Sequence, residues 1–178
     1  MMNGGQEQLD FFGKSYQSWL SEAREDLHGR LRAGEALTCP CCDQYCKVYR
    51  RKLNSSMARY LIEIVKEFQM TAGAWVRVPE LHVYKSESQR GDYAYLTHWG
   101  FIEQKRNEND PTRKESGLWR PTESGIAFAF RRLSAPRHVY LYDNQLLKVS
   151  DETIDIEESL GVKFDYSELM QPAPLVEK

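Results

Sequence analysis

A chain of 178 residues, 41% of them hydrophobic, is long enough for one main domain with extensions, and we expect it to fold. No stretch approaches the ~18 apolar residues of a membrane span, and residues 1–8 lack the features of a signal peptide, so we expect a cytoplasmic protein. The net charge of −2 conceals a basic middle: residues 47–142 carry 17 basic and 10 acidic side chains, whereas both flanking segments are acidic. A basic middle suits a polyanionic partner, or else is an ordinary solvated surface.

The first predicted element is an amphipathic helix within residues 1–34. Its apolar positions recur every three or four residues from Tyr16 to Leu31, Ser15 can cap its start, and Gly34 follows its end. A helix with one apolar stripe has to dock on something. That partner is either the rest of the chain or a second copy, so a homodimer is possible.

Residues 35–53 form a predicted cysteine knuckle followed by a basic strand. Cys39 and Cys42 stand in a Cys-Pro-Xaa-Cys turn of the kind that opens zinc knuckles, and Cys46 could supply a third ligand. Cys41, next to Cys42, is poorly placed to share the ion. The fourth ligand is open, since the histidines stand at no diagnostic spacing: His28, His82, His98 and His138.

Three interpretations of the cysteines stay open at this point. One is a single structural zinc, and another is four reduced cysteines that serve as turn and core residues. The third, a redox or nucleophilic role, lacks a base and an orienting partner in the sequence. We expect no disulfide in a cytoplasmic chain.

Residues 54–135 are predicted to form the main domain. A core helix starts between Asn54 and Ser56 and presents an apolar face through Phe68. We expect a short strand at 75–78 and a helical turn at 79–81, followed by a third helix from Ser86 or Ser88 to His98. Strands at 101–106 and 118–120 then flank a polar loop. The last predicted helix of this domain is capped by Thr122, and its apolar face comprises Ile126, Ala127, Phe130 and Leu133.

Residues 136–178 are expected to hold a β-hairpin, a short helix and an acidic tail. The segments 138–142 and 146–149 flank Asp143-Asn144-Gln145, which is a hairpin signal, and Gly161 follows a helical stretch that starts near Ile154. The whole pattern predicts an α+β fold, namely a winged helix-turn-helix with an N-terminal helix, a cysteine-rich knuckle and a C-terminal extension.

Two resemblances support this expectation. Residues 75–133, with Leu96-Thr97-His98-Trp99-Gly100-Phe101-Ile102-Glu103 and Leu118-Trp119-Arg120-Pro121-Thr122-Glu123-Ser124-Gly125, resemble the recognition helix, wing and following helix of MarR-like and PadR-like regulators. The wider stretch from Cys39 to Leu169 is similar to small proteins of unassigned function encoded by bacteriophages and prophages. The first resemblance implies a winged helix, which serves either DNA binding or protein docking.

Basic and polar side chains on three elements are the candidate DNA contacts. The groove side of the third helix, the wing and the basic strand supply them: Lys85, Ser88, Gln89, Arg90 and Tyr93; Lys105, Arg106, Arg113 and Lys114; and Arg50, Arg51 and Lys52. Asp92 and the acidic residues of the wing weaken this set, and a solvated surface is the alternative for each group.

The sequence thus predicts a winged-helix DNA-binding protein, a transcriptional or accessory regulator of phage or prophage type. We expect no catalysis, because the chain shows no paired carboxylates, phosphate-binding loop or metalloenzyme histidine motif. The alternative is an interaction module that binds a host protein in host takeover or counter-defence. The strongly acidic C-terminal segment favours that alternative.

Overall fold

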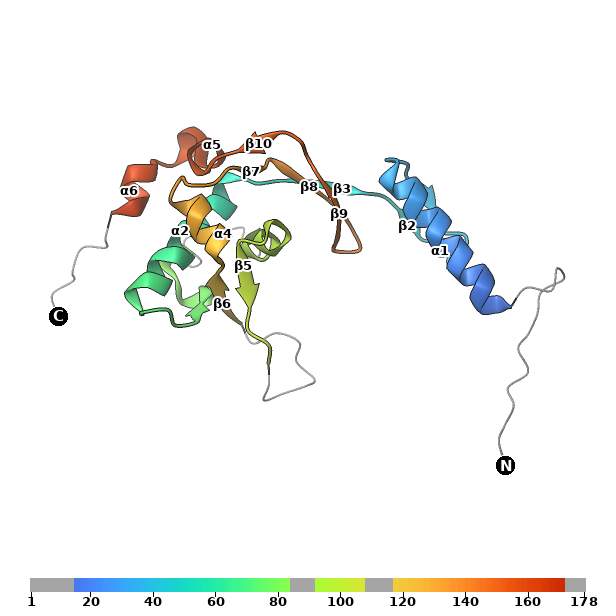
Figure 1. Ribbon diagram of the computed structural model, residues 1–178, viewed down its shortest axis with the longest axis horizontal. Coiled ribbons are helices and arrows are strands. Elements are labelled where there is room, and N and C mark those ends of the chain that lie inside the picture. Colours follow the sequence, from blue (N-terminus) through green and yellow to red (C-terminus); the bar gives the residue numbers. More distant parts are fainter. Residues whose placement is uncertain (1–14, 84–91, 108–116, 172–178) are drawn as a thin grey trace, which may run out of the picture. The chain divides into compact units, whose positions relative to one another are not determined.

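The computed structural model describes residues 15–83, 92–107 and 117–171, which form a mixed α+β protein (Figure 1). The chain divides into two compact units. Residues 1–50 and 140–148 belong to unit 1, and residues 51–139 and 149–178 belong to unit 2. The division cuts across the four predicted segments, because the hairpin tip is grouped with the N-terminal helix and the knuckle.

Unit 1 is built on helix α1 (Tyr16–Arg32) and a small hairpin of β1 (Leu37–Thr38) and β2 (Tyr45–Cys46). The Ser15 hydroxyl caps α1 by accepting from the Ser18 amide at 3.2 Å, and Gly34 follows the helix with φ +91°, as predicted. The apolar face is buried only in its second half. The core of unit 1 consists of Leu27, Leu31, Leu37 and Cys46.

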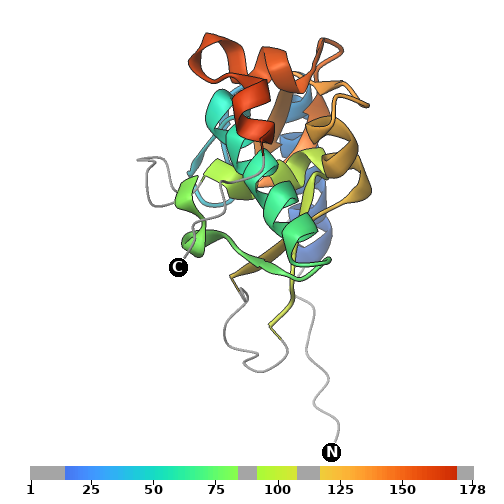
Figure 2. The same cartoon turned by 90° about the vertical axis from the view of Figure 1, so that its left-hand side faces the viewer.

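Unit 2 is organised around helix α2 (Ser55–Met70). Asn54 caps it by accepting from the Met57 amide at 2.9 Å, and the side chains of Tyr60, Leu61 and Ile64 are fully buried. Figure 2 shows the C-terminal helices beside α2. The elements of this unit that α2 contacts include η2 (Asp92–Trp99), β4 (Val76–Arg77), β6 (Leu118–Pro121), α4 (Glu123–Ala129), α5 (Ile156–Leu160) and α6 (Tyr166–Met170).

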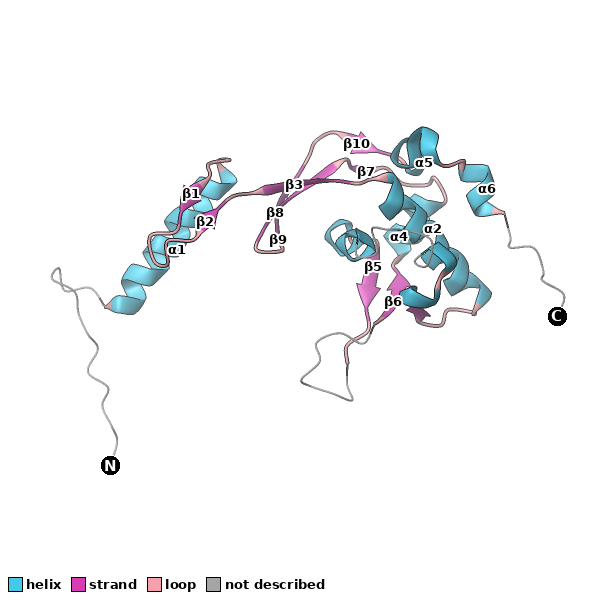
Figure 3. Ribbon diagram, turned by 180° about the vertical axis from the view of Figure 1, so that it is seen from behind, coloured by secondary structure: helices cyan, strands magenta, loops and turns pink. Residues whose placement is uncertain are grey.

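A three-stranded antiparallel sheet in the order β4-β6-β5 lies in the same unit (Figure 3). Strand β6 is central, between β4 (Val76–Arg77) and β5 (Ile102–Gln104). Glu103 lies directly opposite Arg120 in this register, and the two side chains form an ion pair. The predicted short strand and the two wing strands therefore belong to one sheet.

Two predicted helices differ in the structure. The described end of the third helix, η2, is a 3-10 helix, while residues 84–91 lie outside the described part. Helix α4 begins after Thr122, as predicted, but ends at Ala129 rather than extending to Leu133, because Arg131 has φ +59°. Phe128 and Ala129 are buried, Ile126 and Phe130 of the predicted face pack half-buried against the same core, and Leu133 is exposed.

The C-terminal extension confirms the predicted hairpin and short helix. Strands β8 (His138–Tyr142) and β9 (Gln145–Val149) are joined through Asp143 and Asn144, which both have positive φ, as a type I′ turn requires. The sheet order is β3-β8-β9, with β3 at Tyr49–Lys52, and the division between the units falls within these strands. A pair of two-residue strands, β7 (Ala135–Pro136) and β10 (Thr153–Ile154), follows in unit 2.

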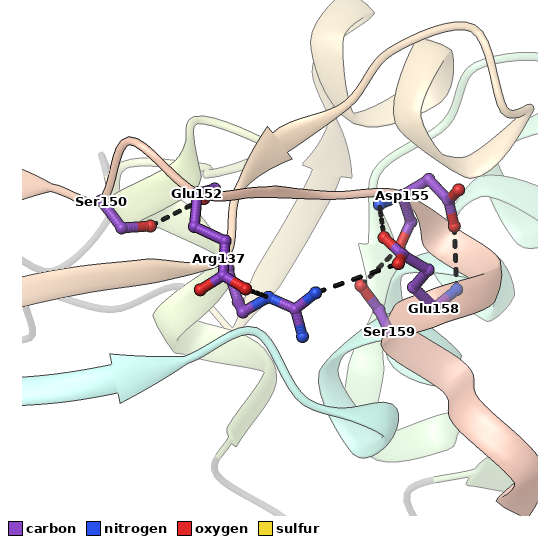
Figure 4. Close-up of polar contacts among 6 residues, drawn as sticks. All are labelled: Arg137, Ser150, Glu152, Asp155, Glu158 and Ser159. Carbon is purple, nitrogen blue, oxygen red and sulfur yellow. Dashed lines mark hydrogen bonds and ion pairs between the residues drawn. The ribbon is translucent and has the colours of Figure 1, made fainter.

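An arginine between β7 and β8 lies against the start of helix α5 in unit 2 (Figure 4). The Arg137 guanidinium pairs with Glu152 at 2.8 Å and lies 3.9 Å from Glu158. Glu158 also completes a capping box with Asp155, whose carboxylate accepts from the Glu158 amide at 2.8 Å. Two short 3-10 segments, η1 (Val78–Glu80) and η3 (Gly161–Lys163), complete the described elements.

Candidate nucleic-acid interface and cysteine turn

The basic strand contacts the described part of the predicted recognition helix. The Arg51 guanidinium lies 5.0 Å over the Tyr95 ring of η2 and donates to the Tyr95 hydroxyl at 3.4 Å. All four residues of β3 are exposed, and the His98 ring lies 6.0 Å from that of Tyr95. Two predicted contact regions, 44 residues apart in sequence, therefore meet in unit 2.

Tyr95 and His98 are the site residues that the sequence interpretation missed. Their signal was the inward placement of Leu96, which is fully buried. Residues three positions apart share a face of a 3-10 helix, so Tyr95 and His98 lie side by side, and Tyr95 is half-buried against the core next to Leu96. That inference requires knowing which side of the helix α2 covers.

Tyr93 and Asp92 of η2 make contacts within the fold. We expected Tyr93 on the groove side, but its ring packs 5.4 Å from that of Tyr60 and edge-on at 5.5 Å from that of Trp119. Asp92, which weakened the DNA interpretation, accepts from the Asn54 side chain at 3.5 Å beside the start of α2. A carboxylate is favourable at that helix end, which accounts for an acid in this segment.

The predicted wing is described only at its base. The Lys105 amide donates to the Leu118 carbonyl at 2.9 Å, and Arg106 is exposed. Arg120, on β6, stacks 4.6 Å over the Trp75 ring and pairs with Glu103, so this arginine supports the sheet. The other predicted contacts lie outside the described residues: Lys85, Ser88, Gln89, Arg90, Arg113 and Lys114.

Three acidic side chains of the C-terminal segment make ion pairs with arginines of unit 2. Glu152 and Glu158 lie against Arg137, and Glu157 pairs with Arg131 at 3.2 Å. Arg131 follows α4, and Arg137 lies between β7 and β8, where its carbonyl accepts from the amide of Leu53, directly after the basic strand, at 3.0 Å. Glu152, Glu157 and Glu158 thus pair with Arg131 and Arg137.

The cysteines lie on and beside a tight turn between β1 and β2. The Cys39 amide donates to the Gln44 carbonyl at 2.8 Å, the Asp43 amide donates to the Cys39 carbonyl at 3.0 Å, and Asp43 has φ +58°. Cys39 is half-buried, whereas Cys41 and Cys42 are exposed. The turn thus presents three thiols near the surface of unit 1.

Cys46 lies in the core of unit 1. Its thiol donates to the Gln44 carbonyl at 3.3 Å and accepts from the Tyr142 hydroxyl at 3.1 Å. The hydrogen bond to Cys46, together with burial, raises the pKa of Tyr142 to about 12. Both hydrogen bonds of the Cys46 sulfur are therefore made within unit 1.

The described residues give no complete metal site. Among them, no group of three or more His, Cys, Asp or Glu side chains could hold a metal ion. The His28 ring packs edge-on against Tyr142 at 5.9 Å, and His138 is buried in β8. Structural zinc at Cys39, Cys42 and Cys46 stays a prediction, and no functional step below depends on it.

Comparisons with known proteins leave the chain without a family assignment. No protein-family model, no curated protein and no solved structure matches it. Within the described residues, no helix combines the length and the apolar character that a membrane crossing requires.

Proposed function

We propose that the chain is a winged-helix DNA-binding protein that acts as a regulator of phage or prophage type without catalysis. The element order of unit 2 supports this proposal, because a core helix, a short strand, a helical region, two strands and a further helix follow one another. The three strands form one sheet, in which the short strand pairs with the second wing strand. Such a frame presents its second helical region and its wing to a duplex.

The contact between Arg51 and Tyr95 is the observation that carries the proposal. It joins an exposed basic strand to the helical region that would enter the major groove. Lys52 extends the same strand, and Arg106 adds a further exposed cation at the wing base. Cations that flank a groove-binding element are the side chains that contact phosphates in protein–DNA complexes.

Fluorescence anisotropy with the full chain and a mixed-sequence duplex tests the proposal across a range of salt concentrations. Arg51→Ala should weaken binding to all duplexes and lower the slope of log K against log salt by about 1. Arg131→Ala is the matched control, since it removes the same charge from an exposed arginine that pairs with Glu157. No binding at low salt, or equal losses in both variants, would refute the proposal.

The alternative function is an interaction module for a host protein, and the first half of α1 favours it. Tyr16 is 62% exposed and Trp19 39% exposed, and their rings lie 6.3 Å apart. Exposed aromatic pairs are typical of protein contacts. This alternative predicts that the chain captures a host protein, that Trp19→Ala abolishes the capture, and that Arg51→Ala leaves it intact.

A further inference from the structure

Exposed and buried side chains alternate along the segment that leads from β2 into β3. Cys46 lies in the core of unit 1 and Val48 packs against that core, whereas Tyr45, Lys47 and Tyr49 are exposed. Side chains at successive positions of an extended segment point to opposite sides. Tyr45, Lys47 and Tyr49 therefore share the side that faces away from the core of unit 1, and we call these three residues the tyrosine face.

The two tyrosines leave much of their surface in solvent. Tyr45 is 63% exposed and Tyr49 51% exposed. At about 3.3 Å per residue of extended chain, they lie roughly 13 Å apart with Lys47 between them. The Lys47 ammonium lies 5.0 Å over the Tyr49 ring, so a cation stands directly beside an exposed aromatic surface.

The charge of this segment favours a polyanion over a protein as the partner of the tyrosine face. Residues 44–53 contain four basic side chains and no acidic one: Lys47, Arg50, Arg51 and Lys52. Arg50 belongs to unit 1, like the tyrosine face, and is exposed. Lysine is depleted at the centre of protein–protein interfaces, whereas clustered lysines and arginines are the groups that bind phosphates.

Exposed aromatic rings beside cations are typical of sites for single-stranded nucleic acid. The unpaired bases present their faces and stack on aromatic side chains, while basic side chains bind the phosphates. The bases of a duplex are stacked on one another and offer only their edges in the grooves. The tyrosine face therefore suits a single-stranded nucleic acid rather than a duplex.

We propose that the tyrosine face binds single-stranded nucleic acid, with bases stacked on Tyr45 and Tyr49 and with phosphates bound by Lys47 and Arg50. This activity goes beyond the proposed binding of duplex DNA. It does not depend on that function either, because a different contact carries the duplex proposal.

Fluorescence anisotropy of the full chain with labelled oligothymidylate, labelled oligouridylate and the mixed-sequence duplex tests the proposal, and the two oligonucleotides distinguish DNA from RNA. Tyr45→Ala and Tyr49→Ala should each weaken binding of the single-stranded oligonucleotide by roughly 5- to 150-fold, because one base stacked on an aromatic ring contributes about 1–3 kcal/mol. Binding of the duplex should stay unchanged in both variants. For the oligonucleotide, Lys47→Ala should lower the slope of log K against log salt by about 0.7.

Conservative variants and a tyrosine on another element are the controls. Tyr45→Phe and Tyr49→Phe keep a ring that can stack and should bind the oligonucleotide as the unmodified chain does, whereas Tyr45→Leu should behave as Tyr45→Ala. Tyr16→Ala is the matched control, because it removes a tyrosine that is 62% exposed from α1 of the same unit. It should leave oligonucleotide binding unchanged. Circular dichroism spectra distinguish a lost contact from unfolding.

Three outcomes would overturn the proposal. The first is no binding of either oligonucleotide at low salt, and the second is binding that the alanine variants leave unchanged or that Tyr45→Leu retains. The third is capture of a protein that needs both tyrosines by a chain that binds no oligonucleotide, which would assign the tyrosine face to protein docking. Duplex binding that Arg51→Ala leaves unchanged refutes the proposed function alone, so the two failures are distinguishable.

Discussion

Substituting Gly125 tests how closely helix α4 approaches the backbone of Phe101, directly before strand β5. Gly125 lies in the first turn of α4, and a Cβ atom placed there would lie 2.0 Å from the Phe101 carbonyl oxygen and 2.8 Å from its carbon. The same carbonyl accepts from the Thr122 amide at 2.9 Å, and the Phe101 ring stacks on Phe128 at 4.6 Å. The obstacle is backbone that is held from two directions, so it cannot yield as a flexible side chain would.

The expected magnitude for Gly125→Ala follows from two opposing effects. Alanine gains up to about 1 kcal/mol over glycine in a helix. Overpacking that shifts the backbone costs typically about 1–3 kcal/mol and occasionally more. The contact here is far inside van der Waals distance, so the upper part of that range applies. We expect a net loss of about 2 kcal/mol in the free energy of unfolding.

Urea denaturation followed by tryptophan fluorescence and circular dichroism measures this loss. Gly29→Ala is the control, because Gly29 lies within α1 and a Cβ atom there would meet nothing within 4 Å. Gly29→Ala should leave unit 1 as stable as before or stabilise it by up to about 1 kcal/mol. A Gly125→Ala variant that unfolds at the same urea concentration as the unmodified chain would show that α4 and the Phe101 strand are not packed as described.

Three further predictions concern single polar contacts. Trp99→Phe removes the indole N–H that donates to the Pro136 carbonyl of β7 at 2.7 Å. The free energy of unfolding, measured by urea denaturation, should fall by about 1–2 kcal/mol. An unchanged urea midpoint would contradict this contact. Asp155→Ala removes the cap of α5 and should lower the free energy of unfolding by about 1 kcal/mol. Asp151 is exposed, so Asp151→Ala is the control and should change that free energy little. Equal melting temperatures for the two variants would argue against the cap. The raised pKa of Tyr142 stabilises the fold below pH ~10, and this contribution is lost as the pH rises towards about 12. Burial also raises the pKa of Tyr166, so the test of the pair is the change in Cys46→Ala: an ultraviolet titration should show that one late tyrosine returns towards the ordinary range. A titration curve that is the same in Cys46→Ala and in the unmodified chain would refute the pair.

Local signals in the sequence predicted most of the elements. The caps at Ser15, Asn54 and Thr122 are confirmed, because a capping side chain bonds an amide only two or three residues ahead. The turn at Asp143 and Asn144 is confirmed for the same reason, since its positive φ values are a property of the turn itself. Such features depend on short stretches of chain and need no knowledge of the rest of the fold.

Long-range packing explains what the sequence did not predict. Whether the side chain of Tyr93 points outward depends on Tyr60 and Trp119, which lie 33 and 26 positions away in the chain. The 3-10 geometry of η2 likewise differs from the α-helix that the pattern favoured. Arg51 was named as a candidate from the local charge run, but its contact with Tyr95 required the tertiary structure.

The way the chain is shared between the two units determines when each can be completed during synthesis. Unit 1 combines residues 1–50 with residues 140–148, so Tyr142 reaches Cys46 only after 96 further positions have been made. At about 5–20 residues per second, the N-terminal helix and the cysteine turn wait on the order of 5–20 seconds for that partner. During this interval the newly made thiols are without the Tyr142 contact, and neither unit can be obtained whole as one uninterrupted fragment.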